Sequence, residues 1–191
     1  MAYDDREIEL RFQLTEEQFN QLKDKVHKTA KFIRLSGQRD VYFTPAHKNF
    51  VKPKYPYEWL SIRERDELAV LNYKHFYPEE ADIKTHCDEY NVEISDSVRF
   101  NKIFKSLDFK ILVVVEKRRW IYEADGKYEI SFDNIKDLGF FVEIEALVDF
   151  GGVEKTRKGL FDFTQGLGID ISRLEKRGYP YMLMKKKGLI K

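Results

Sequence analysis

Apolar and polar residues alternate strictly in the first patterned segment of the chain. In residues 7–14 every second residue is apolar, and charged or polar residues fill the positions between them. A period of two is typical of a β-strand with one buried face and one polar face. Similar patterns predict further strands at 38–44, 58–65, 68–76, 85–94, 111–122, 127–134 and 140–148.

Four segments have the signals of helices. Thr15 and Gln18 form a capping box ahead of an apolar stripe at Phe19, Leu22 and Val26. Asp96 is predicted to cap a second helix, whose apolar residues are Val98, Ile103, Phe104 and Leu107. Further helices are expected at about 152–167 and 172–186, the last opened by Ser172 with Glu175 as its capping partner.

The order of these segments indicates the fold class. Hairpins are expected across Asp66-Glu67 and Asp125-Gly126, and the second pair is a favoured two-residue turn. Many antiparallel strands with a few helices are typical of an α+β fold. The 191 residues contain no internal repeat and no low-complexity linker, so residues 1–191 are expected to form a single domain.

The composition of the chain limits which binding partners and which cellular compartment are expected. The formal net charge is +1, which gives no general attraction to nucleic acid or to membranes, so neither is an expected partner. Cys87 is the only cysteine, which excludes an internal disulfide framework. No apolar run approaches the ~20 residues of a membrane helix, and residues 1–6 do not resemble a signal segment. A soluble cytoplasmic protein is the expectation, and a homodimer is left open.

Acidic residues recur on the polar faces of the predicted strands. Glu7 and Glu9 lie two residues apart, so their carboxylates point to one face, and Glu143 and Glu145 repeat this spacing. Asp133 lies on the polar face of a neighbouring strand. Adjacent like charges repel each other, and a hard divalent cation such as Mg²⁺ or Mn²⁺ relieves that repulsion through oxygen ligands. One such pair is more typical of a solvated strand, whereas two pairs with Asp133 indicate a metal site.

Basic residues also collect on the polar faces. A triphosphate carries about four negative charges, which guanidinium forks and lysine ammonium groups can neutralise. Each cation alone is more typical of a solvated surface, but together they indicate a phosphate-binding interior. The candidates are Arg11, Arg63, Arg65, Lys74, Lys117 and Arg119.

These motifs resemble the CYTH family, which includes class IV adenylyl cyclases, thiamine triphosphatase and tripolyphosphatases. The segment from Glu7 to Arg11 resembles the opening Glu-x-Glu-x-Lys signature of the family, with Arg in place of Lys. The resemblance extends to about Glu145. It includes Asp40–Phe43, Trp59–Arg63, Leu71–Lys74, Asp88–Tyr90, Lys117–Arg119 with Tyr122, Phe132-Asp133 and Gly139–Glu145. The class IV cyclase branch is the most similar.

The resemblance implies a closed antiparallel eight-stranded β-barrel, the triphosphate tunnel, with flanking helices. It implies metal binding at Glu7, Glu9, Glu143 and Glu145, with Asp133 and Glu89 nearby. It implies phosphate binding and catalysis by Arg11, Arg63, Lys74, Lys117 and Arg119. The implied reaction converts ATP to cyclic AMP and pyrophosphate with Mg²⁺ or Mn²⁺.

Two alternatives stay open beside the cyclase. One is a triphosphatase that hydrolyses thiamine triphosphate, inorganic tripolyphosphate or nucleoside triphosphates. The other is a module that binds polyphosphate or a phosphorylated RNA end without turnover. Ser61 stands where the family usually has Arg, and Cys87 and Asn91 stand where a cyclase often has Arg and Glu. Arg65 either replaces the missing cation or faces solvent at the hairpin end.

Overall fold

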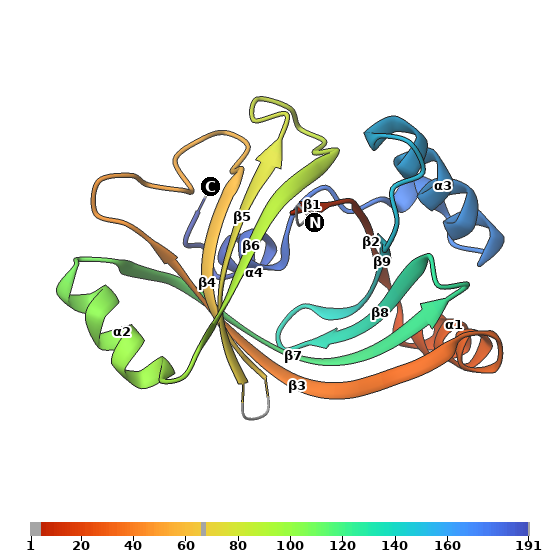
Figure 1. Ribbon diagram of the computed structural model, residues 1–191, viewed down its shortest axis with the longest axis horizontal. Coiled ribbons are helices and arrows are strands. Elements are labelled where there is room, and N and C mark those ends of the chain that lie inside the picture. The colour runs from red at the N-terminus through yellow and green to blue at the C-terminus, as the bar shows by residue number, and fades with distance from the viewer. Residues whose placement is uncertain (1–4, 66–67, 191) are drawn as a thin grey trace. The chain divides into compact units, whose positions relative to one another are not determined.

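The computed structural model describes residues 5–65 and 68–190, so the turn expected at Asp66-Glu67 lies outside the described residues. The strands form one sheet in the order β1-β6-β5-β4-β3-β7-β8-β9-β2 (Figure 1). Their bounds are β1 Arg6–Glu7, β2 Glu9–Leu14, β3 Lys31–Thr44, β4 Glu58–Arg65, β5 Leu68–Tyr77, β6 His86–Ile94, β7 Lys110–Ala124, β8 Tyr128–Ile135 and β9 Gly139–Ala146. The helices are α1 Glu16–Thr29, α2 Ser97–Ser106, α3 Val153–Gly166 and α4 Tyr179–Lys186, with a 3₁₀ turn, η1, at Ile171–Arg173.

The chain contains two compact units. The α1/α3 unit comprises Glu7–Ser36 and Lys117–Lys176. The α2/α4 unit comprises the described residues of Met1–Arg6, Gly37–Glu116 and Arg177–Lys191. The expectation of a single domain stays a prediction. Within the two described ranges, no helix is both long and apolar enough to cross a lipid bilayer.

The α1/α3 unit has a core between the apolar face of its strands and two helices. Phe12 of β2 and Val142 of β9 lie in this core with Phe19 of α1 and Leu160 of α3, and each is at most 2% exposed. The ring of Phe19 meets that of Phe132 edge to face at 5.4 Å. The predicted capping box is present, since Thr15 and Gln18 exchange hydrogen bonds of 3.2 and 3.0 Å. The alternating pattern and the cap therefore place α1 on the apolar side of these strands.

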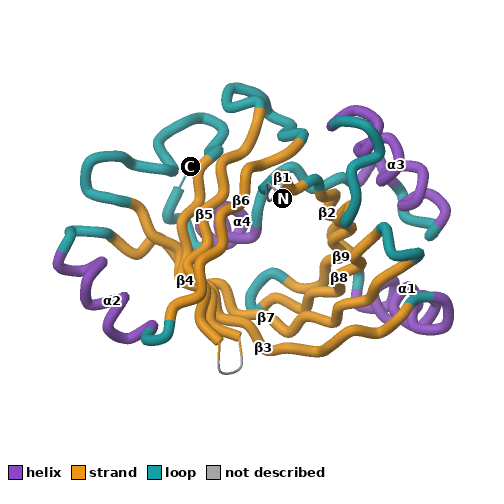
Figure 2. Tube along the Cα trace, in the orientation of Figure 1, coloured by secondary structure: helices purple, strands orange, loops and turns teal. Residues whose placement is uncertain are grey.

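The α2/α4 unit has a second apolar cluster. Phe104 of α2 packs on Val41, Phe43 and Ile62, which lie on one face of β3 and β4. Asp96 caps α2 as predicted, because its Oδ1 accepts a hydrogen bond from the Arg99 amide at 2.8 Å. Residues 45–57 connect β3 to β4 without helix or strand (Figure 2).

Most element predictions are confirmed, with three differences. The strand predicted at 7–14 is interrupted at Ile8, so the sheet has nine strands where eight were expected. The strand predicted at 38–44 begins at Lys31, because pairing with distant strands extends it beyond its clear alternation.

The helix predicted at 172–186 is confirmed only from Tyr179 onward. Asp170, not Ser172, caps the short η1 turn, and the chain becomes helical again only at Tyr179. Pro180 has no amide hydrogen and its ring clashes with a preceding helical turn, so it suits the first turn of α4 and not a helix interior.

Candidate functional site

The polar face of the α1/α3 unit is organised in rows by the strand register. Glu129 lies directly opposite Glu145, and Glu145 lies directly opposite Glu9. Glu123 of β7 is opposite Glu129 and extends the row to four carboxylates. Directly opposed residues project from the same face of an antiparallel sheet, with Cβ atoms ~4.5–5.5 Å apart. The two predicted pairs therefore contribute Glu9 and Glu145 to one row across four strands.

The next row joins acidic and basic side chains. Arg11 is opposite Glu143, and its Nε donates a 2.5 Å hydrogen bond to Glu143 Oε1. Its Nη2 donates to Glu9 Oε1 at 2.6 Å. The Nη2 of Arg119 also donates to the second oxygen of Glu143. Both oxygens of this buried carboxylate are therefore held by guanidinium groups.

The environment of Glu143 keeps it ionised. Burial alone would raise the pKa of Glu143, but the charges of Arg11, Arg119 and Lys117 outweigh burial. The net effect holds its pKa well below the usual range.

Asp133 and Arg119 form a bidentate pair in the third row. Arg119 Nε donates to Asp133 Oδ1 at 2.7 Å, and Nη2 donates to Oδ2 at 2.5 Å. Lys117 Nζ lies 3.9 Å from Oδ2. Asp133 is 0% exposed. This buried carboxylate fixes the position of the Arg119 guanidinium on the polar face of the sheet.

The row of four carboxylates has the donor chemistry for a hard divalent cation. Opposed like charges destabilise a sheet, and oxygen-rich groups are the ligands that Mg²⁺ and Mn²⁺ prefer. In the side-chain positions of the described residues, no three acidic, histidine or cysteine groups converge on one metal-binding point. The donor types and the strand register therefore suit a divalent metal ion. To bind it, the glutamate side chains would have to turn toward one another.

The sequence did not identify Glu129 and Glu123 as members of this row. Glu129 alternates with Ser131 and Asp133 on the polar face of the strand predicted at 127–134, so the sequence predicts which face it occupies. Pairing with Glu145 depends on strand register, which periodicity alone does not specify.

The remaining predicted cations, together with Glu89, lie in the α2/α4 unit. Arg63 is opposite Asp40, with 3.3 Å between Arg63 Nε and Asp40 Oδ1. Lys74 is opposite Glu89, and Lys74 Nζ lies 3.6 Å from Glu89 Oε2. Arg65 is half-buried opposite Gln38. All three cations therefore lie on one face of β4 and β5. For Arg63 and Arg65 this agrees with their spacing of two residues.

An uncharged row separates these two ion pairs. Ser61 lies between Tyr42 and Asn72, and Asn72 lies opposite Asn91. Asn72 Nδ2 donates to Asn91 Oδ1 at 2.9 Å and to Glu89 Oε1 at 2.5 Å. Ser61 is 0% exposed, and its Oγ has no hydrogen-bond partner in the described part of the chain.

The structure also places Cys87 and Glu7, which are not part of any row described above. Cys87 is buried opposite Phe76 in β6, and it is the third position that departs from the resemblance. Glu7, the first predicted acid, ends the short strand β1 and is 8% exposed.

A comparison with known protein families identifies the family of this chain. The CYTH domain family matches residues 5–179. The chain belongs to the CYTH family. The predicted fold class is confirmed: this CYTH protein is α+β, with an antiparallel β-barrel sheet and flanking helices.

Individual relatives cover nearly the whole CYTH chain. A proposed adenylate cyclase of Methanocaldococcus jannaschii is 27% identical over 175 residues, which is 91% of this chain and 95% of the relative. A solved structure from Pyrococcus horikoshii OT3 is 26% identical, with a TM-score of 0.78 over 94% of this chain and 99% of that one. A Hippeastrum protein, described as a proposed adenylyl cyclase with dominant triphosphatase activity, has a TM-score of 0.62 at 18% identity. It covers 96% of this chain and 95% of its own, and this likeness shows the fold alone.

Proposed function

We propose that this CYTH protein is a divalent-metal-dependent enzyme that converts ATP to cyclic AMP and pyrophosphate. The observation that carries the proposal is the row Glu123, Glu129, Glu145 and Glu9 beside the cations Arg11 and Arg119. A triphosphate with its counter-ions needs both kinds of charge within one polar face. The resemblance to the M. jannaschii relative, whose name proposes an adenylate cyclase, supports the same reaction class.

The cations of the site would bind and orient phosphate oxygens. Arg119 is held by Asp133 through two of its donors, so its fork is pre-oriented with little further entropy to lose. Lys117 of the same strand, β7, and Arg11 of β2 would add positive charge. Arg63, Arg65 and Lys74 are proposed as further phosphate-binding residues on the strength of the family motifs.

The acidic residues would hold the metal. Glu9, Glu129 and Glu145 are the proposed ligands because they share one row, and Glu7, Glu89, Asp133 and Glu143 stay candidates from the family motifs. When bound, Mg²⁺ or Mn²⁺ neutralises charge that develops on the phosphate oxygens.

The reaction requires positioning more than a protein nucleophile. The ribose 3′-hydroxyl would attack the α-phosphorus, the bond to the β-phosphate oxygen would break, and pyrophosphate would leave as the hydroxyl proton passes to solvent. Pre-oriented guanidinium groups would stabilise the charge on the leaving pyrophosphate.

Triphosphate hydrolysis is the second candidate function. The same cations and carboxylates would serve attack by water on the terminal phosphorus of ATP, thiamine triphosphate or tripolyphosphate. Cys87 and Asn91 favour this alternative, because they stand where a cyclase often has Arg and Glu. The Hippeastrum protein, described as a proposed adenylyl cyclase with dominant triphosphatase activity, has the same fold.

A product assay separates these functions. The protein is incubated with ATP, thiamine triphosphate or tripolyphosphate, each with Mg²⁺ or Mn²⁺, and the products are separated by anion-exchange chromatography. Cyclic AMP and pyrophosphate in equal amounts support the cyclase, whereas ADP or orthophosphate supports hydrolysis. Arg119→Ala should lose activity, while Arg99→Ala, at an 83% exposed side chain, should keep it. Absence of turnover for all three compounds would contradict both enzymatic functions.

A further inference from the structure

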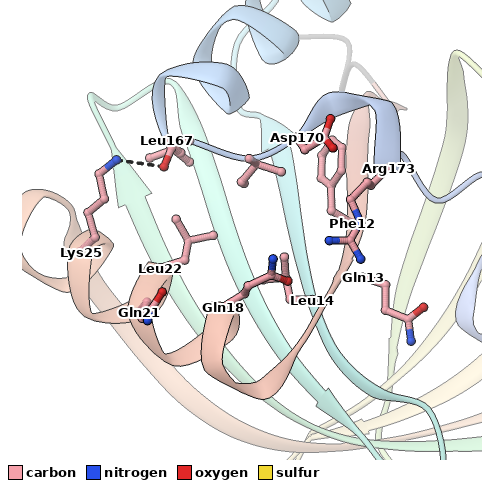
Figure 3. A pocket seen from close by; sticks show the side chains of 12 residues that line it. Phe12, Gln13, Leu14, Gln18, Gln21, Leu22, Lys25, Leu167, Asp170 and Arg173 are labelled. Carbon is pink, nitrogen blue, oxygen red and sulfur yellow. Dashed lines mark hydrogen bonds between the residues drawn. The ribbon is translucent and has the colours of Figure 1, made fainter.

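A cavity of about 380 Å³ lies in the α1/α3 unit, away from the charged rows. Its walls come from β2, from α1 and from residues 167–173 after α3 (Figure 3). Phe12 and Leu14 line it, whereas Glu9 and Arg11 of the same strand project from the opposite face. Gln13 of the lining shares the face of Arg11, so β2 separates the apolar floor of the cavity, and not its whole lining, from the proposed triphosphate site.

The floor of the cavity is apolar. Phe12 is 1% exposed and belongs to the core of the unit. Leu14, Leu22, Leu167 and Ile169 are partly buried and pack against that core. The cavity thus exposes the edge of a well-packed core, and an apolar occupant would remove this surface from water at a gain of ~25 cal/mol per Å².

The wall opposite α1 is anchored at both of its ends. Lys25 Nζ of α1 donates a 2.9 Å hydrogen bond to the carbonyl oxygen of Leu167, which Figure 3 shows as a dashed line. At the other end, the amide of Glu175 donates to the carbonyl oxygen of Arg11 at 2.8 Å, and Leu174 forms a bridge with Phe12. The cavity is therefore preformed, which lowers the entropy cost of filling it.

The one carboxylate of the lining is already engaged. Asp170 Oδ1 accepts hydrogen bonds from the amide and the hydroxyl of Ser172, at 3.0 and 2.7 Å. These bonds, helped by the nearby charge of Arg173, lower the pKa of Asp170. The carboxylate is thus ionised, and one of its two oxygens is engaged within its own turn.

The available polar groups are donors. The Arg173 amide donates to the carbonyl oxygen of Asp170 at 3.1 Å, whereas its guanidinium has no hydrogen bond among the described residues and extends from the wall toward β2 (Figure 3). Lys25 keeps donors beyond the one used by Leu167, since an ammonium group has three. Gln18 uses its oxygen in the capping box, which leaves its amide nitrogen toward the cavity.

From the apolar floor and the unused hydrogen-bond donors we infer that the cavity binds a small amphiphile with an apolar body and a single carboxylate head. The apolar body would lie on the floor of Leu14, Leu22 and Ile169. The carboxylate would accept hydrogen bonds from Arg173, for which a guanidinium fork is well shaped. An apolar floor combined with a few convergent polar groups is typical of small-molecule sites.

Titration calorimetry with octanoate tests this inference, without any triphosphate present. Octanoate is expected to bind one to one and saturably, while 1-octanol and octylammonium bind at least tenfold more weakly. Arg173→Gln should reduce octanoate affinity about tenfold, and Lys25→Gln should reduce it less. Arg99→Gln is the matched control and should leave octanoate affinity unchanged, because Arg99 is exposed in the α2/α4 unit.

Two further measurements keep the result interpretable. Urea unfolding of each variant without octanoate shows that its fold is intact, and amide NMR shifts should map the bound octanoate to residues 12–25 and 167–173. Failure of octanoate to saturate, equal affinity for octanoate and octanol, or unchanged affinity in both Arg173→Gln and Lys25→Gln would overturn the inference. None of these outcomes depends on whether the protein turns over a triphosphate.

Discussion

Arg119 and Asp133 face each other on β7 and β8 and share two hydrogen bonds of 2.7 and 2.5 Å. Both oxygens of this fully buried carboxylate are directed at one guanidinium group. The pair is thus a fixed support for the guanidinium on the polar face of the sheet.

Removing this support should destabilise the protein. Asp133→Asn leaves the Arg119 guanidinium beside a neutral amide, and breaking a buried ion pair costs ~3–5 kcal/mol of unfolding free energy. Urea denaturation in EDTA measures the loss. Asp162→Asn, which removes an exposed partner of Lys158, should cost less than ~1 kcal/mol. Equal losses in the two variants would show that Asp133 does not support Arg119.

Glu143 should make stability depend on pH in the acid range. Its pKa is lowered in the folded protein, so the unfolded chain binds more protons in the window between the two pKa values. The stabilisation is complete above the unfolded value of ~4.3 and is lost as the pH falls through the folded value. Unfolding free energies measured in EDTA from pH 7 to pH 2 should therefore fall less steeply in Glu143→Gln. Glu64→Gln, at a more exposed pair with Arg39, should follow the wild-type slope.

Metal binding should depend on the row of four carboxylates. Calorimetric titration with Mn²⁺ is expected to show at least tenfold weaker binding in Glu145→Gln and in Glu129→Gln, because each removes a charged ligand. Without metal, the same variants should be more stable by ~0.2–1 kcal/mol, since each removes a like charge from the row. Wild-type Mn²⁺ affinity in both variants would remove this row as the metal site.

Two serines should respond in opposite directions to the same substitution. Ser61→Ala removes a buried hydroxyl without a hydrogen-bond partner in the described residues, so unfolding free energy should stay the same or rise by up to ~1 kcal/mol. Ser131→Ala removes a 2.9 Å hydrogen bond to the Glu129 carboxylate and should cost ~1.5–3 kcal/mol. A clear loss of stability in Ser61→Ala would mean that its hydroxyl is satisfied by ordered water.

Arg65 is expected to compensate for the uncharged side chain at position 61. Position 61, Arg63 and Arg65 project from one face of β4, and the four residues from Ser61 to Arg65 span ~13 Å, so Arg65 would contact a phosphate bound between the two positions and would not reach position 61 itself. Triphosphate turnover should therefore fall in Arg65→Ala about as much as in Arg63→Ala. Intact turnover in Arg65→Ala, with loss in Arg63→Ala, would assign Arg65 to the rim.

Local pattern was sufficient for most of the elements and for the faces of the strands. The alternation in 7–14 and 140–148 places Glu9 and Glu145 on a polar face and Phe12 and Val142 in the core, because side chains alternate with a period of two. The capping signals at Thr15 and Asp96 are equally local, since a cap joins residues three positions apart.

Pairing between distant strands could not be read from those patterns. The row that joins Glu129, Glu145 and Glu9 depends on the register of β8, β9 and β2, and a shift of one residue would turn every side chain to the other face. The same register brings Arg119 to Asp133 and leaves Ser61 among uncharged neighbours. The residue types and their faces thus follow from the order of amino acids along the chain, whereas the charge that each one meets follows from contacts between segments up to 136 residues apart.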